Sequence, residues 1–145
     1  ARGGIGQAGV TAAPFSAWID NWRIVSQTGP EADPLSRLHV SAAAADFSYD
    51  VTLSSERPLV LHGDAGYSVK SATGQASYYY SQPFYSVTGT LNLPDGPVSV
   101  TGQSWLDREW SSQPLAADQK GWEWFSLHFD TGEKLMAFRL RDKGP

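Results

Sequence analysis

The chain has 145 residues, which is the length of one domain or of part of one. Its formal net charge is -4, with 11 Lys and Arg against 15 Asp and Glu and no basic block, so a nucleic-acid partner is excluded because phosphates need a clustered positive face. The absence of Cys excludes disulfides, thiolate metal ligands and cysteine nucleophiles. No apolar run approaches the about 18 residues that a transmembrane helix needs.

The first half of the chain has the spacing of β-strands. Residues 1–13 are rich in Gly and Ala, and we expect them to be loosely ordered. Phe15 to Val25 then carries apolar groups on both faces, and Ala43 to Leu53 alternates as one half-buried strand. Pro58 to His62 and Tyr67 to Lys70 are short extended pieces on either side of the turn HGDAG.

Two hairpins are predicted in the second half. Tyr85 to Leu93 alternates up to LPDGP, where Asp-Gly favours a tight turn. A last pair of strands runs from Trp122 to Asp130 and from Lys134 to Arg141 around the turn DTGE. With no helical stripe, the chain is predicted to be an all-β antiparallel meander of about eight strands, whose edges require closure into a barrel or pairing with further chain.

The segment GQSWLDREWSSQ, residues 102–113, is the densest in chemically active groups. Strand alternation places Trp105, Asp107 and Glu109 on one face. Two carboxylates at this spacing lie about 7 Å apart, so that burial would push their pKa values apart and let one donate a proton while the other accepts it. The alternative is that both face solvent, as most carboxylates do.

Other catalytic arrangements are poorly supported. The GQS of residues 102–104 lacks the closing glycine of a nucleophile elbow, because Leu106 stands at that position. No ligand-spaced partner accompanies any of the histidines, so neither a metal site nor a cofactor is predicted. The three histidines are His39, His62 and His128.

The turn HGD is the one histidine motif that we keep as a candidate. His62 and Asp64 flank Gly63, and a His and an Asp around a glycine turn can form a proton-relay pair. The alternative is that they only cap the turn.

Aromatic clusters are the second signal, with six residues each of Trp, Tyr and Phe. They include YYY at 78–80 and WEWF at 122–125, which on strands would line a wall with flat, amphipathic groups. A barrel of about eight strands has room for core side chains or for one small apolar ligand. An aromatic core, or a contact with further chain, is the alternative, although buried Tyr and Trp need partners for their polar tips.

Six segments, taken in order, carry a resemblance to a known family. They are AAPFSAWIDNW, RLHVSA, PLVLHGDAGYSVK, ASYYYSQP, VTGQSWLDREWSSQPLA and GWEWFSLHFDTGEKLMAFRLR. The set resembles the lipocalin-like family of predicted secreted hydrolases, which includes the AttH-type proteins and, more distantly, the hydroxyneurosporene synthases, which are carotenoid hydratases. The resemblance covers residues 5–145, and the combination of WLDREWSSQ with HGDAGYSVK is highly specific.

The resemblance implies two lipocalin-like β-barrels in a longer polypeptide. Residues 14–145 would then be a barrel segment that runs to the junction with a second barrel, and the missing strands or that second barrel would be its partners. A secreted or periplasmic location is expected on the same ground. In the hydratase branch an acid protonates an isolated C=C bond and water then adds, so Asp107 and Glu109 would be the matching acid and base.

Two functions of different classes follow. The first is a hydratase or hydrolase that acts on a hydrophobic substrate, with Asp107 as general acid and Glu109 as its partner. The second is a non-catalytic binder or carrier of a lipid-like or carotenoid-like molecule. In both, the aromatic walls of the site are expected to be Trp105, Trp110, Tyr79 and Trp124.

Overall fold

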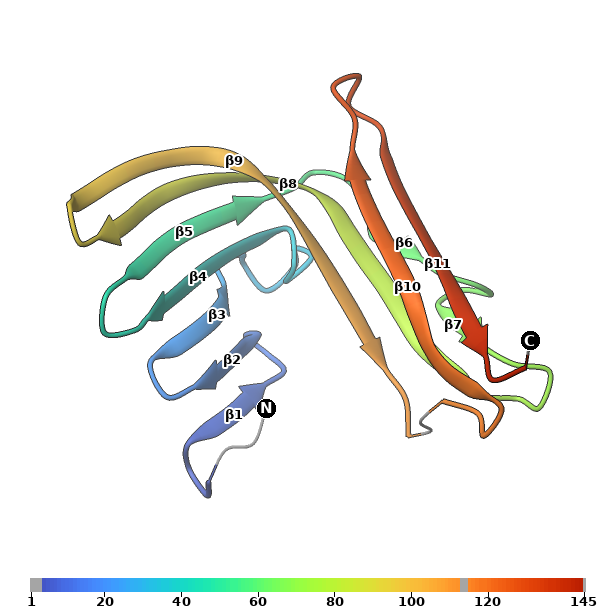
Figure 1. Cartoon of the computed structure of the whole chain (residues 1–145). Coiled ribbons are helices and arrows are strands. Elements are labelled where there is room, and N and C mark those ends of the chain that lie inside the picture. Colours follow the sequence, from blue (N-terminus) through green and yellow to red (C-terminus); the bar gives the residue numbers. More distant parts are fainter. Residues whose placement is uncertain (1–3, 113–114, 145) are drawn as a thin grey trace. The chain divides into compact units, whose positions relative to one another are not determined.

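In the computed structural model the described residues, 4–112 and 115–144, form eleven β-strands and no helix (Figure 1). The all-β, antiparallel prediction is therefore confirmed, and no helix of the described part is long and apolar enough to cross a membrane. In chain order the strands are β1 (Ala8–Thr11), β2 (Ser16–Ile19), β3 (Trp22–Ser26), β4 (Arg37–Ala43), β5 (Ser48–Ser54), β6 (Val60–Leu61), β7 (Tyr67–Val69), β8 (Ala76–Leu93), β9 (Gly96–Trp110), β10 (Gln119–His128) and β11 (Lys134–Asp142).

The chain divides into two compact units. Unit 1 comprises Ala1–Arg57 and Phe84–Ser104, and unit 2 comprises Pro58–Pro83 and Trp105–Pro145. The division falls inside the two longest strands, so β8 and β9 each contribute one part to each unit. They are joined by the tight turn predicted from LPDGP, in which Gly96 has a φ of 118° that favours glycine.

Unit 1 is an antiparallel meander in the order β1, β2, β3, β4, β5 and β8, with β9 paired to β8. Its sheet is open, because β1 pairs with β2 and does not close onto β9. The core lies where β4, β5 and β8 meet, since Leu38, opposite Leu53, has no exposed surface and Tyr85 is 1% exposed. The Tyr85 hydroxyl donates a hydrogen bond of 2.6 Å to the carbonyl of Leu35, which satisfies the one polar atom of that side chain.

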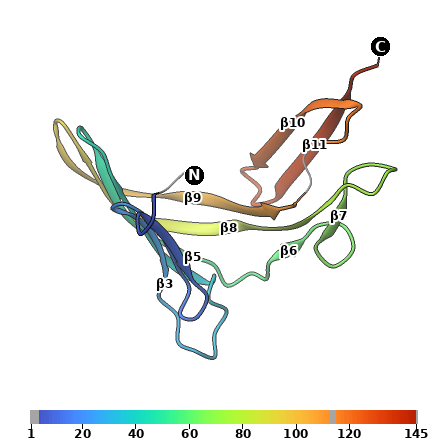
Figure 2. The ribbon, with the colours of Figure 1, turned by 90° about the horizontal axis from the view of Figure 1, so that it is seen from below.

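Unit 2 is built on the first part of β8. The short strands β6 and β7 pair with it antiparallel, at Tyr80 and Ser81 and at Ala76 to Tyr78 (Figure 2). β10 and β11 form a separate two-stranded antiparallel sheet around the turn predicted from DTGE. An isolated hairpin of this kind is marginally stable in water, so the apolar side chains on its two faces need cover.

The structure corrects three expectations from the sequence. Ala8–Thr11, inside the stretch expected to be loosely ordered, pairs with β2 as strand β1. The alternation from Ala43 to Leu53 is not one strand, because Ala44 N–H donates to the Phe47 carbonyl at 2.8 Å and closes a turn between β4 and β5. Eleven strands replace the expected eight or so, because β1 was not expected, Phe15 to Val25 contains the two strands β2 and β3, and Arg37–Ala43 forms a strand of its own.

Candidate functional site

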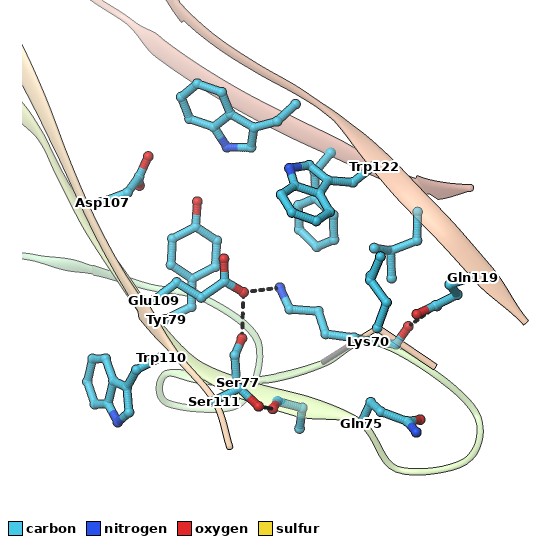
Figure 3. Close-up of a pocket in the computed structure, with 15 residues that line it drawn as sticks. Lys70, Gln75, Ser77, Tyr79, Asp107, Glu109, Trp110, Ser111, Gln119 and Trp122 are labelled. Carbon is cyan, nitrogen blue, oxygen red and sulfur yellow. Dashed lines mark hydrogen bonds and ion pairs between the residues drawn. The ribbon is translucent and has the colours of Figure 1, made fainter. Parts of the chain in front are cut away.

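A pocket of about 470 Å³ lies within unit 2, in the size range of small-molecule sites (Figure 3). It is formed by β8, β9, β10 and β11 together with the segments that follow β7 and β9. Its lining is Lys70, Gln75, Ala76, Ser77, Tyr79, Asp107, Glu109, Trp110, Ser111, Leu115, Gln119, Trp122, Trp124, Phe138 and Leu140.

One wall of the pocket is aromatic because of strand register. Trp122 pairs with Leu140 and Trp124 with Phe138 across β10 and β11, so these four side chains share one face. The intervening Phe125 lies on the opposite face and is 57% exposed. Within WEWF, the two Trp side chains therefore lie on the pocket face of β10, and Phe125 lies on the other face.

Asp107 lies on the pocket wall and is half-buried. Its Oδ1 accepts hydrogen bonds from Ser81 Oγ and from Trp105 Nε1, the latter at 3.0 Å. A side-chain hydrogen bond with Tyr79 gives the Asp107 carboxyl group a third partner.

Glu109 lines the same pocket in a different environment. Its Oε1 lies 2.9 Å from the Lys70 ammonium nitrogen and accepts a 2.7 Å hydrogen bond from Ser77 Oγ (Figure 3). Burial alone would raise the pKa of Glu109, but the Ser77 hydrogen bond and the bond and charge of Lys70 outweigh it and lower that pKa. Glu109 is therefore an anion at neutral pH.

Lys70 and Tyr79 complete the polar side of the pocket. The Lys70 ammonium lies 5.0 Å from the ring centre of Tyr79 and 4.3 Å from that of Phe138. Tyr79 is 3% exposed, and burial raises the pKa of its hydroxyl; the charge of Asp107 acts in the same direction and a hydrogen bond with Trp124 against it. The Tyr79 hydroxyl therefore keeps its proton near neutral pH and remains a hydrogen-bond donor.

Two of the predicted aromatic residues have roles other than the expected wall. Trp105 does not line the pocket; it binds Asp107, and its ring lies 5.7 Å from that of His128. Trp110 does line it, but its ring stacks on Tyr78 at 5.7 Å and meets Tyr80 edge-on. Tyr79 and Trp124 both lie on the pocket wall.

The turn HGDAG holds His62 against β8. Gly63 has a φ of 67°, and a Cβ there would lie 2.2 Å from the Tyr67 carbonyl oxygen, so only glycine fits. Asp64 and Tyr67 exchange backbone hydrogen bonds across the turn, and the Asp64 side chain is exposed outside the pocket. The structure gives His62 another partner, because its Nε2 lies 2.7 Å from Ser81 Oγ.

The site contains residues that the sequence prediction missed. Ser77 and Ser81 bind the two carboxylates, and Lys70 neutralises one of them. The serines had a signal, since alternation along ASYYYSQP puts both on the face of Tyr79. Lys70 had no such signal, because it pairs with Glu109, a residue far from it in the sequence.

A second hollow, of about 620 Å³, lies in unit 1 among β1, β2, β3 and β4. Its lining includes Trp18, Trp22 and Arg23, but none of the predicted site residues. Within residues 4–112 and 115–144, no group of three or more His, Asp or Glu side chains is placed to hold a metal ion.

Replacing Lys70 by Met should raise the pKa of Glu109, because burial would no longer be opposed by the ammonium group. In the native protein the lowered pKa means that Glu109 stabilises the fold above its unfolded-state pKa and loses this contribution as the pH falls through its native pKa. Carboxyl ¹³C titration by NMR measures the pKa of Glu109 in the wild type and in Lys70→Met. The exposed Lys120, changed to Met, is the matched control, and equal titration curves for Glu109 in all three proteins would contradict the assignment.

The chain is similar in fold to a protein of known structure. The fold matches, with a TM-score of 0.77 and 40% identity, the crystal structure of a protein from Nitrosomonas europaea that is proposed to be an AttH; the match covers 88% of this chain and 38% of that one. The open antiparallel sheet is therefore a partial lipocalin-like barrel. The chain spans well under half the length of this relative.

The AttH-like family model matches residues 1–145, and the chain therefore belongs to the AttH-like family. The family resemblance expected from the sequence is confirmed, whereas the more distant relation to carotenoid hydratases stays a prediction. A search among curated proteins finds no match.

Proposed function

We propose that the pocket of unit 2 binds a hydrophobic small molecule and that Asp107 acts on it as a general acid in a hydration reaction. One observation carries the proposal: a carboxyl group anchored at Oδ1 by Ser81 and Trp105 stands on the wall of a pocket whose other wall is Trp122, Trp124, Phe138 and Leu140. An apolar body would bury surface against the rings while its reactive bond faces Asp107.

The chemistry is a proton transfer followed by addition of water. Asp107 gives its proton to one carbon of a C=C bond, and the electron pair of that bond forms the new C–H bond. The cation left on the other carbon is stabilised by neighbouring aromatic faces. Water then forms the C–O bond and releases a proton, for which the Glu109 carboxylate, anionic at neutral pH, is the acceptor in the same pocket.

Hydrolysis through a serine nucleophile is less well supported by the contacts. Ser81 has no exposed surface and gives its proton to Asp107, while Ser77 is 4% exposed and gives its proton to Glu109. Neither hydroxyl is free to attack a bound electrophile. Any hydrolase activity of this site would have to use water directly, with the same carboxyl groups.

A carrier without catalysis is the second candidate. Its supporting observation is the partial exposure of the aromatic wall, since Trp122 is 60% and Trp124 41% exposed before any ligand is bound. Large exposed apolar side chains around a hollow favour binding whether or not a reaction follows.

One assay separates these functions. The neutral probe N-phenyl-1-naphthylamine should quench tryptophan fluorescence saturably, and geranyl acetate, which has C=C bonds and an ester, should compete with it. In ¹⁸O-labelled water, mass spectrometry would show the label in an added hydroxyl for a hydratase and in released acetate for a hydrolase. Competition without either product would support the carrier, and no saturable quenching would contradict both candidates.

A further inference from the structure

His62, Ser81 and Asp107 form a continuous hydrogen-bonded chain behind the pocket. Asp107 is the only member on the pocket wall, and Ser81 is fully buried between the other two. His62 Nε2 lies 2.7 Å from Ser81 Oγ, which in turn donates to Asp107 Oδ1. The chain thus connects the pocket carboxyl to a half-buried imidazole on a different segment.

Counting protons fixes the direction of these bonds. A serine hydroxyl has one proton, and Ser81 gives it to Asp107. Ser81 can therefore only accept from His62, so Nε2 of His62 must carry a proton. In a neutral imidazole the other nitrogen, Nδ1, then has the free electron pair.

We propose that this chain is a proton relay that reloads Asp107 from His62 after each turnover. The inference rests on the proposed role of Asp107 as a general acid. His62 Nδ1 binds a proton from solvent, His62 Nε2 passes its proton to Ser81 Oγ, and Ser81 passes its own to Asp107 Oδ1. The hydroxyl is restored, the imidazole changes tautomer, and one proton has moved from water to Asp107.

The surroundings of His62 fit such a group. Its ring lies against that of Tyr79, with the ring centres 4.1 Å apart and the ring planes tilted by 33°. Burial lowers the pKa of His62; the charge of Asp107 acts to raise it, that of Lys70 to lower it and that of Glu109 to raise it. The imidazole is therefore neutral at pH 7 and can take up and release a proton.

The arrangement is distinct from a serine-protease triad. In a triad the carboxylate binds Nδ1 of the histidine and the serine faces the substrate. Here the carboxyl group binds the serine, and the carboxyl group faces the pocket. Ser81 is accordingly a conductor of protons, and His62 and Ser81 are positioning residues that act through Asp107.

The first test needs no substrate. Long-range ¹H–¹⁵N NMR spectra of the full chain should show His62 at pH 7 as the neutral tautomer with its proton on Nε2. Asp107→Asn should lower the pKa of His62, because it removes a negative charge, and Ser81→Ala should release the imidazole to mixed tautomers. A His62 signal that is indifferent to both changes would overturn the relay.

The second test uses hydration of geranyl acetate in ¹⁸O-labelled water. His62→Gln keeps a donor to Ser81 but cannot take up a proton, so turnover should fall by about 10-fold or more. This loss should be smaller than the loss of about 10²–10⁴-fold that follows removal of a general acid. Ser81→Thr should keep most activity and Ser81→Ala should lose it, whereas added imidazole should rescue His62→Ala. His39→Gln in unit 1 is the matched control.

The two failures are distinguishable. Loss of turnover in Asp107→Asn together with full turnover in His62→Gln and Ser81→Ala would overturn the relay and leave the proposed function standing. Full turnover in Asp107→Asn, or no product from the wild type, would overturn both, because a relay has no task without the acid.

Discussion

Asp107→Asn should lower the rate of hydration by about 10²–10⁴-fold, the usual contribution of a positioned proton donor. Asparagine has nearly the same shape, and its Oδ1 can still accept from Ser81 and Trp105. What it lacks is an acidic proton. We therefore expect the melting temperature and the dissociation constant of N-phenyl-1-naphthylamine to stay close to the wild-type values while ¹⁸O incorporation disappears.

The matched control is Asp130→Asn, a change of the same type at an exposed position in the turn between β10 and β11. It should leave turnover, stability and probe binding unchanged. Equal turnover by the two variants and the wild type would remove Asp107 from the mechanism and leave the carrier as the better account of the pocket.

The carboxylate pair shows how far strand alternation carries a prediction. The spacing at Asp107 and Glu109 was sufficient to place both groups on one face, and both line the pocket. It could not distinguish their environments, because these depend on other segments: Ser81 of β8 at one carboxyl group, and Ser77 of β8 with Lys70 after β7 at the other. Such cross-strand contacts depend on register, which no local pattern contains.

The hairpins were predictable for a different reason. Asp95 with Gly96, and the turn of DTGE, encode their geometry within a few residues, and the structure has hairpins at both. The turn from Ala44 to Phe47 has no such signal. The apolar residues keep the same period through this turn, and the strand ends there because the Ala44 N–H donates a hydrogen bond to the Phe47 carbonyl.

His62 illustrates a limit of motif reasoning. Sequence proximity suggested Asp64 as its partner, yet strand pairing brings β6 beside Tyr80 and Ser81 of β8. The imidazole therefore meets a serine 19 positions away along the chain. The histidine could be chosen as a candidate from the sequence, but its partner could be identified only from the register of the sheet.

Trp124→Ala should weaken binding of N-phenyl-1-naphthylamine by about 10–100-fold, because removing the contact surface of one large side chain costs about 1.5–3 kcal/mol. Trp124 stands opposite Phe138 on the aromatic wall and also bonds to Tyr79. Trp124→Phe should keep most of the affinity, since a ring remains, while the pKa of Tyr79 should rise because the indole hydrogen bond that lowers it is lost. Fluorescence and ultraviolet titrations measure the two effects separately.

The neighbouring Phe125 supplies the control for this test. It is an exposed aromatic residue on the same strand, but its side chain lies on the face of β10 away from the pocket. Phe125→Ala should therefore leave the dissociation constant within about 2-fold of the wild-type value, since substitutions away from a binding contact usually change free energies by no more than about 0.5 kcal/mol. If Phe125→Ala weakened binding as much as Trp124→Ala, the probe would be bound by general hydrophobic contact with the hairpin. The pocket would then not be the binding site.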